Sequence, residues 1–221
     1  IFHNNFFLIT LFAILLKIVL AGLFSSDYQE KIFIPFVDYF INNFGNPWQH
    51  YYIENREVAF PFPPLMLYFL APFQFIINFL EIHNAFLKNL IFKIPTLALD
   101  IIIYVYLLRL FPQKKISVFV IYFISPIILY AAYINSQLDL IPTAFLFFAF
   151  YFLVKNKFRL SAVSISVAIL CKSYVLIILP LIIIYLLKNT KLQNLLIYCI
   201  IILISYLLIS YPFILTKEYQ F

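Results

Sequence analysis

Glycine is almost absent from this chain, with 2 residues in 221, and only 11% of the residues are charged. A soluble globular domain has about a quarter of its residues charged and about half apolar. Here 65% of the residues are apolar and the mean hydropathy is +1.02. The composition predicts an all-α integral membrane protein, and the lack of glycine excludes a glycine-rich phosphate loop.

Cysteine and histidine are also scarce. Cys171 and Cys199 both lie in apolar runs, so they provide neither a disulfide framework nor a set of four metal ligands. His3, His50 and His83 are too scattered along the chain to indicate a zinc site. Neither residue type therefore predicts a metal centre.

The net charge of +6 does not indicate nucleic acid, because the basic residues lie in short loops between apolar runs. Such loops set the orientation of a multi-pass membrane protein, with the basic ones facing the cytoplasm. Three basic groups occur at every second turn: Arg109 with Lys114 and Lys115, then Lys155 with Lys157 and Arg159, then Lys188 with Lys191. We therefore predict that these groups face the cytoplasm and that residues 135–139 and 172–173 face outward.

The apolar segments, ordered by this charge pattern, predict seven transmembrane helices. They lie at residues 6–24, 90–110, 116–134, 140–154, 160–171, 174–187 and 195–212. Residues 65–80 are also apolar, but the segment has 16 residues and is interrupted by Pro72. If it crossed, the later loops would have the wrong orientation, so we interpret it as an interfacial or re-entrant helix.

Residues 25–89 then form one long outer loop. A second interfacial helix is expected within it, because residues 32–44 have an amphipathic pattern at helical spacing. We expect residues 1–221 to be a single transmembrane module. The chain begins without Met and ends just after an apolar run, so we also expect a fragment whose C-terminal part is missing.

Four polar residues are predicted to lie at the outer membrane face: Asp27, Gln137, Asp139 and Lys172. A carboxylate there can serve as a general base or a metal ligand, and an ammonium can hold a phosphate. Structural interpretations stay open for each charged member. Asp27 and Asp139 could cap helices, and Lys172 could snorkel from a helix end.

Two charged residues are predicted within the membrane itself. Lys17 either snorkels or packs against another helix, and Asp100 lies mid-span with Lys17 as one candidate partner. We interpret Asp100 as structural rather than catalytic. Arg56, in the outer loop, could bind a phosphate or be ordinary loop charge.

Four sequence elements together resemble the GT-C superfamily of membrane glycosyltransferases, which use polyprenyl-phosphate or polyprenyl-diphosphate sugars. The nearest likeness is to the first mannosyltransferase of GPI-anchor synthesis and to bacterial polyprenyl-phosphate-mannose-dependent enzymes. The elements are Ser26-Asp27-Tyr28, Phe60-Pro61-Phe62-Pro63-Pro64-Leu65, Ser125-Pro126 followed by Asn135-Ser136-Gln137-Leu138-Asp139, and Ala168-Ile169-Leu170-Cys171-Lys172-Ser173-Tyr174. They occur in the family's order and span most of the chain.

The resemblance implies an inverting transfer of a hexose, mannose by this likeness, from a polyprenyl-phosphate donor to a lipid or glycan acceptor. It implies Asp27 as general base and Lys172, Asp139, Gln137, Arg56 and Tyr28 as substrate-binding residues. It also implies a module of seven helices with two juxtamembrane helices in the first outer loop. The expected location is the prokaryotic plasma membrane, among membrane lipids, with the active site on the outer face.

Two departures from the family pattern bear on the chemistry. Gln29 stands where a second acid of an Asp-x-Asp pair is found, so we expect a metal-independent enzyme with no cofactor and leave a divalent metal as an open alternative. Val175 stands where proline is common. Two other function classes stay open: a transporter or lipid flippase with Lys17, Asp100 and Lys172 on its path, and a non-catalytic assembly subunit.

Overall fold

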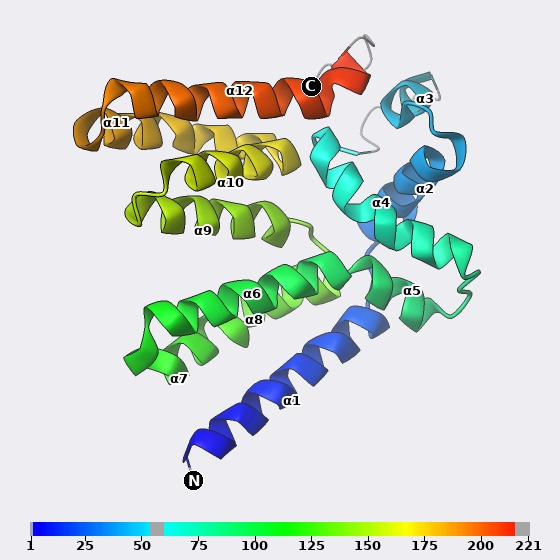
Figure 1. Cartoon of the computed structure of the whole chain (residues 1–221). Coiled ribbons are helices and arrows are strands. Elements are labelled where there is room, and N and C mark those ends of the chain that lie inside the picture. Colours follow the sequence, from blue (N-terminus) through cyan, green and yellow to red (C-terminus); the bar gives the residue numbers. More distant parts are fainter. Residues whose placement is uncertain (1, 54–59, 215–221) are drawn as a thin grey trace. The chain divides into compact units, whose positions relative to one another are not determined.

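A computed structural model describes residues 2–53 and 60–214, and every regular element in these two ranges is a helix (Figure 1). The prediction of an all-helical chain is confirmed for this part. The chain divides into two compact units. Unit 1 comprises Ile1–Ile41 and Leu70–Leu140, and unit 2 comprises Asn42–Phe69 and Ile141–Phe221.

Unit 1 contains the N-terminal helix and the helices of the middle of the chain. In order they are α1 (Phe2–Leu23), the π-helical turn η1 (Gln29–Phe33), α2 (Ile34–Asn43), the second part of α4 (Pro64–Phe79), α5 (Ala85–Phe92), α6 (Ile94–Leu110), η2 (Pro112–Lys114), α7 (Lys115–Val118), η3 (Phe119–Phe123), α8 (Pro126–Ile128) and η4 (Leu129–Ile134). α1 packs along α5 and η4.

The C-terminal end of α1 approaches α5 closely. A Cβ atom added to Gly22 would lie 2.3 Å from the Phe86 ring, so glycine is what permits this approach. Buried Ala21 packs nearby with Ala132 and Tyr133 of η4. Small residues at such positions let helix backbones come close in a membrane, where packing rather than the hydrophobic effect drives association.

A bend of 50° separates α5 from α6, where the sequence predicted a single transmembrane helix over residues 90–110. Pro95 lies in the first turn of α6 and explains the break. Proline has no amide hydrogen, and its ring would clash with the carbonyl of Ile91 if the helix continued. The bend brings Lys93 to the junction of the two helices, where it caps α5 and precedes α6.

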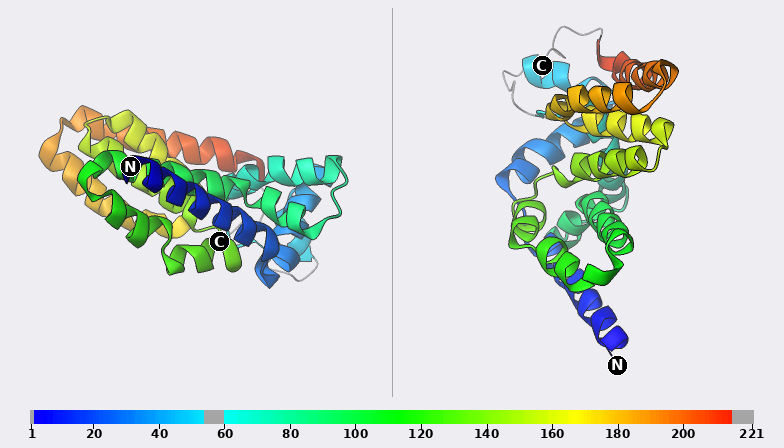
Figure 2. Two further views of the ribbon diagram at one scale, coloured as in Figure 1. Left: turned by 90° about the horizontal axis from the view of Figure 1, so that it is seen from below. Right: turned by 90° about the vertical axis from the view of Figure 1, so that its left-hand side faces the viewer.

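Unit 2 contains a stack of helices from the C-terminal half. Its elements are α3 (Pro47–Ile53), the first part of α4, α9 (Leu140–Val154), α10 (Phe158–Cys171), the 3₁₀ turn η5 (Ser173–Ile178), α11 (Leu179–Asn189) and α12 (Leu192–Ile214). α9 to α12 lie side by side, in green to red-orange (Figure 2). The predicted helix at 174–187 therefore begins as a 3₁₀ turn and becomes α-helical only at Leu179.

α10 is the buried helix of this stack. Ser161, on its first turns, is fully buried and donates a hydrogen bond to the Ala149 carbonyl of α9 at 2.8 Å. The same hydroxyl lies 3.1 Å from the Tyr198 hydroxyl of α12. One polar side chain thus links three helices, a use of serine that is common in membrane proteins.

Three helical stretches of the described residues are long and apolar enough to cross a membrane: Phe6–Leu23, Pro112–Ile134 and Leu192–Phe213. The bent pair α5 and α6 adds a fourth if it is one broken span. Large apolar side chains on α1 stand exposed, such as Phe12 at 71%, as a lipid-facing surface requires. The protein is therefore embedded in a membrane.

Candidate functional site

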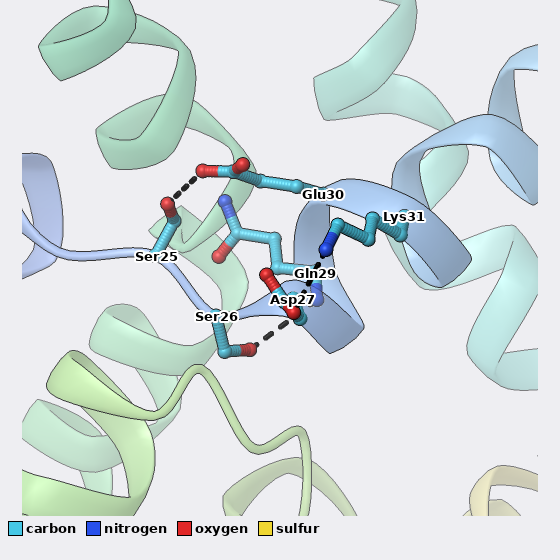
Figure 3. Close-up of polar contacts among 6 residues, drawn as sticks. All are labelled: Ser25, Ser26, Asp27, Gln29, Glu30 and Lys31. Atoms are coloured by element: carbon cyan, nitrogen blue, oxygen red, sulfur yellow. Dashed lines mark hydrogen bonds and ion pairs between the residues drawn. The ribbon is translucent and has the colours of Figure 1, made fainter.

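The predicted acidic motif lies in the turn that follows α1 (Figure 3). The Ser26 hydroxyl accepts a hydrogen bond from the Gln29 amide at 3.3 Å, and the Ser25 hydroxyl donates to the Glu30 carboxylate. Serine is a preferred residue for capping the first turn of a helix in this way. Asp27 thus lies at a helix start, where a carboxylate is also favoured by the helix dipole.

Asp27 is exposed and forms an ion pair with Lys31 at 2.9 Å, one turn further along. Both side chains remain largely in solvent, at 79% and 70% exposure. The hydrogen bond to Asp27, with the charge of that carboxylate, raises the pKa of Lys31. The capping side chain is therefore Ser26 and not Asp27, which lies in the first turn and pairs with Lys31. The catalytic role of Asp27 stays a prediction.

Tyr28, the predicted neighbour of Asp27 in the site, is also accessible. Its side chain is 55% exposed, and its ring stacks on Phe33 with the centroids 6.5 Å apart. It can therefore offer both an apolar face and a hydroxyl to a bound molecule.

The turn that carries Asp27 is anchored by buried polar contacts. Gln29 is fully buried and donates a hydrogen bond to Asn89 of α5 at 2.9 Å. Asn89 in turn donates to the Gly22 carbonyl of α1 at 3.3 Å. Gln29 thus holds the turn against α5, and this anchoring leaves Asp27 as an exposed side chain on a fixed backbone.

Lys93 also anchors the turn that carries Asp27. Its buried ammonium donates to the carbonyls of Ala21 at 3.2 Å, of Phe24, and of Tyr133 at 3.0 Å. Ala21 lies in the last turn of α1 and Phe24 directly follows this helix, at the end where carbonyls lack partners within the helix and a cation is favoured. The third carbonyl, that of Tyr133, belongs to η4. One side chain thereby joins the end of α1 to the end of η4.

The outer turn after η4 carries Gln137 and Asp139. Ser136 has a positive φ of 56°, and the Gln137 amide donates to the Ala131 carbonyl at 2.8 Å, so the backbone folds back on η4. Gln137 and Asp139 are both half-buried. Because Lys93 holds Tyr133, the segments bearing Asp27 and Asp139 start from neighbouring points of unit 1.

Lys172 lies in unit 2, between α10 and η5. Its extended backbone, with φ −158° and ψ 118°, ends α10 after Cys171. Its ammonium lies 5.2 Å from the ring centroids of both Phe62 and Tyr174, within the range of cation–π attraction. Two of the four elements that carried the family resemblance, the one at residues 60–65 and the one at 168–174, are therefore in contact.

The remaining predicted residues have mixed outcomes. Arg56 lies outside the described residues. Asp27, Tyr28, Gln137 and Asp139 belong to unit 1 and Lys172 to unit 2, so their convergence on one cavity stays a prediction. No cluster of three His, Cys, Asp or Glu side chains suited to a metal occurs in residues 2–53 and 60–214. Independence of metal also stays a prediction.

The buried charges of unit 1 are paired. Lys17 and Asp100 are both fully buried and form an ion pair, and the Tyr133 hydroxyl donates to the same carboxylate oxygen at 2.5 Å. The Lys17 ammonium also lies 3.7 Å from the Phe123 ring centroid. Of the two alternatives for Lys17, the structure shows packing against another helix and not snorkelling, because its carboxylate partner lies on α6 inside the bundle. The expectation that Lys17 pairs with Asp100 is confirmed.

Sequence reasoning missed the roles of Lys93, Gln29 and Asn89. A signal for Lys93 was present, since a lysine two residues before Pro95 in an apolar run must find acceptors where a helix breaks.

Comparisons of the chain with family models, with curated proteins and with solved structures found no match.

Proposed function

We propose that this chain is the membrane module of an inverting glycosyltransferase of the GT-C type, which takes a hexose, mannose by its resemblance, from a polyprenyl-phosphate donor. The observation that carries the proposal is the anchored turn after α1. Lys93 and Gln29 fix its backbone on both sides, while the Asp27 carboxylate stays exposed. A general base needs this combination of fixed position and access to the acceptor.

In the proposed reaction, Asp27 accepts the proton of an acceptor hydroxyl as its oxygen attacks the anomeric carbon of the sugar. The bond from that carbon to the phosphate oxygen breaks, and polyprenyl phosphate leaves with the bonding electron pair. Lys172 neutralises the leaving phosphate, aided by Gln137 or Arg56, while Asp139 and Tyr28 orient the reactants. The exposed ion pair with Lys31 is readily exchanged for the acceptor hydroxyl.

The proposed topology keeps seven spans and an outer loop with interfacial helices. α9, α10 and the η5–α11 segment are apolar but have 15, 14 and 17 residues. At 1.5 Å per residue such helices are shorter than a hydrocarbon core of about 30 Å. Their crossing requires local thinning of the bilayer or flanking residues that extend the span. The alternating basic loops support this arrangement.

The test is sugar transfer by the full-length protein from a panel of polyprenyl-phosphate sugars. Asp27→Asn should reduce turnover by about a hundredfold or more, the usual contribution of a general base. Glu30→Gln is the matched control, because Glu30 is an exposed acid of the same turn. Wild-type turnover by a folded Asp27→Asn protein would remove Asp27 from the mechanism.

A transporter or flippase is the second candidate, favoured by one observation: the fully buried Lys17–Asp100 pair lies in a candidate span. Charges within a membrane often mark a transport path. Flux of substrate or lipid is measured in proteoliposomes. Transport would be favoured if Asp100→Asn abolished this flux and Asp27→Asn left it unchanged. Sugar transfer lost through Asp27→Asn favours the enzyme. Absence of both activities would point to an assembly subunit.

A further inference from the structure

A cavity of about 670 Å³ lies in unit 1, between the first residues of α1 and the α7–η3 helix. Its apolar walls are Phe6 and Ile9 on one side and Phe119 and Val120 on the other. Both helical stretches, Phe6–Leu23 and Pro112–Ile134, are candidate spans. The cavity therefore lies beside the first residues of two candidate spans.

Part of the lining of this cavity is polar and positively charged. Gln113, Lys114, Lys115 and Ser117 contribute to its lining next to the apolar walls. Neither lysine forms an ion pair with any carboxylate among the described residues. Two cations without a counter-ion next to apolar walls match the two parts of an anionic phospholipid, its phosphate and its acyl chain.

A second cavity shows that this combination is not general in the chain. It lies in unit 2, has a volume of about 270 Å³, and its lining includes Ile169, Leu176, Tyr198 and Leu203 but no charged residue. Such a cavity can accept an acyl chain without selecting a headgroup. Only a site that adds paired cations to apolar walls can discriminate lipid charge.

We propose that the cavity between α1 and α7–η3 is a binding site for an anionic phospholipid. Lys114 and Lys115 hold the phosphate, and one acyl chain lies against Phe6, Phe119 and Val120. The basic loops predicted to face the cytoplasm include these lysines, and the cytoplasmic leaflet is the one enriched in anionic lipid in many membranes. The proposal is independent of the proposed glycosyltransferase activity.

Native mass spectrometry tests the site. Full-length protein is reconstituted in nanodiscs of equal parts phosphatidylcholine and phosphatidylglycerol, extracted into detergent, and scored for retained lipid. Wild type should retain phosphatidylglycerol in preference to phosphatidylcholine. Lys114→Gln with Lys115→Gln should weaken phosphatidylglycerol retention by roughly tenfold or more, since each juxtamembrane cation contributes about fivefold.

Two controls separate a built site from general surface attraction. Lys155→Gln with Lys157→Gln removes an exposed basic pair outside the cavity and should leave retention unchanged. Val120→Trp fills the groove without changing charge and should weaken retention. Because the Val120 side chain is exposed on the surface of the helix, the melting temperature of the variant is measured to check that it folds. Equal losses for both lysine pairs, or full retention by a folded Val120→Trp, would overturn the proposal.

A third comparison distinguishes a lipid site from a phosphate site. Inorganic phosphate and glycerol phosphate, added at the same concentration as dispersed phosphatidylglycerol, should not displace the bound lipid, because they cannot occupy the apolar walls. Displacement by inorganic phosphate as effective as that by phosphatidylglycerol would overturn the assignment to a lipid.

Discussion

Lys17 and Asp100, 83 residues apart in the chain, form an ion pair in which neither side chain has any exposed surface. The pair joins α1 to α6, and Tyr133 of η4 completes it through its hydroxyl. Three helices of unit 1 therefore meet at one carboxylate. Because a lone charge is far more costly in this position than a pair, each member of the pair fixes the other.

Breaking this pair on one side should destabilise the protein strongly. We expect Lys17→Met and Asp100→Asn each to lower the free energy of unfolding by about 3–5 kcal/mol, because each leaves a buried charge or acceptor without its partner. The double variant should lose much less than the sum of the two, since no uncompensated charge remains. Unfolding in a denaturing detergent series measures all three.

Lys155→Met is the matched control for this cycle, because Lys155 is exposed and in a loop. Its free energy of unfolding should stay within about 0.5 kcal/mol of wild type. Additive losses in the double variant would contradict the pairing of Lys17 with Asp100.

Lys93 gives a second prediction, on local order rather than on global stability. In Lys93→Met the carbonyls of Ala21, Phe24 and Tyr133 lose their common donor. Amide hydrogen exchange should then accelerate across residues 25–31 and 135–139 together, because one side chain holds both segments. In the proposed enzyme the same variant should lower kcat more than it changes KM, since it displaces the base without removing a binding group.

The control for Lys93 is Lys88, which lies on α5 one turn earlier and whose ammonium, unlike that of Lys93, donates to no acceptor among the described residues. Lys88→Met should leave exchange in both segments unchanged. If Lys93→Met accelerated exchange in only one of the two segments, the inference that Lys93 joins them would be wrong.

Much of the fold could be predicted from the sequence, because apolar runs and loop charges are local signals. The helical ranges were predicted well for α4 and α9, and Lys17 was named as one candidate partner of Asp100 because buried charge is rare. The break at Lys93 could not be seen in hydropathy, because Pro95 interrupts the hydrogen-bond pattern without lowering the apolar character of the run.

The candidate site was predictable only in part. Asp27 was selected as a carboxylate after a span, but its ion pair with Lys31 depends on the helical turn that starts at that point. The contact of Lys172 with Phe62 links residues 110 positions apart and comes from the folding of unit 2. The order of residues along the chain suggested the motifs around Asp27 and Lys172. The distances of these two residues to Lys31 and Phe62 depend on how the chain folds.

The Asp27–Lys31 pair predicts a pH dependence at alkaline pH. The folded-state pKa of Lys31 is raised above its ordinary value of 10.5, so the pair's stabilisation of the turn is fully present from neutral pH up to that value. The stabilisation is lost as the pH rises through the raised pKa. Because both side chains are exposed, the effect should be small and should diminish with added salt.

NMR titration of a ¹⁵N-labelled Lys31 ammonium measures this effect. Asp27→Asn should return the Lys31 pKa toward 10.5, because the hydrogen bond to a charged partner is its largest cause. Glu30→Gln is the control and should shift it less, since Glu30 acts on Lys31 only through its charge. An unchanged Lys31 pKa in Asp27→Asn would show that the pair does not persist in solution.

The placement of α4 yields the last prediction, since the whole proposed topology depends on whether Pro64–Phe79 crosses the membrane. Glu30 and His83 are exposed residues that lie before and after this helix. In a variant lacking Cys171 and Cys199, single cysteines introduced by Glu30→Cys and His83→Cys should both react with a membrane-impermeant maleimide from outside intact cells. Asn156→Cys, in a basic loop, should react only after the membrane is opened. If α4 crossed, Glu30→Cys and His83→Cys would react from opposite sides, and the outer loop over residues 25–89 would be wrong.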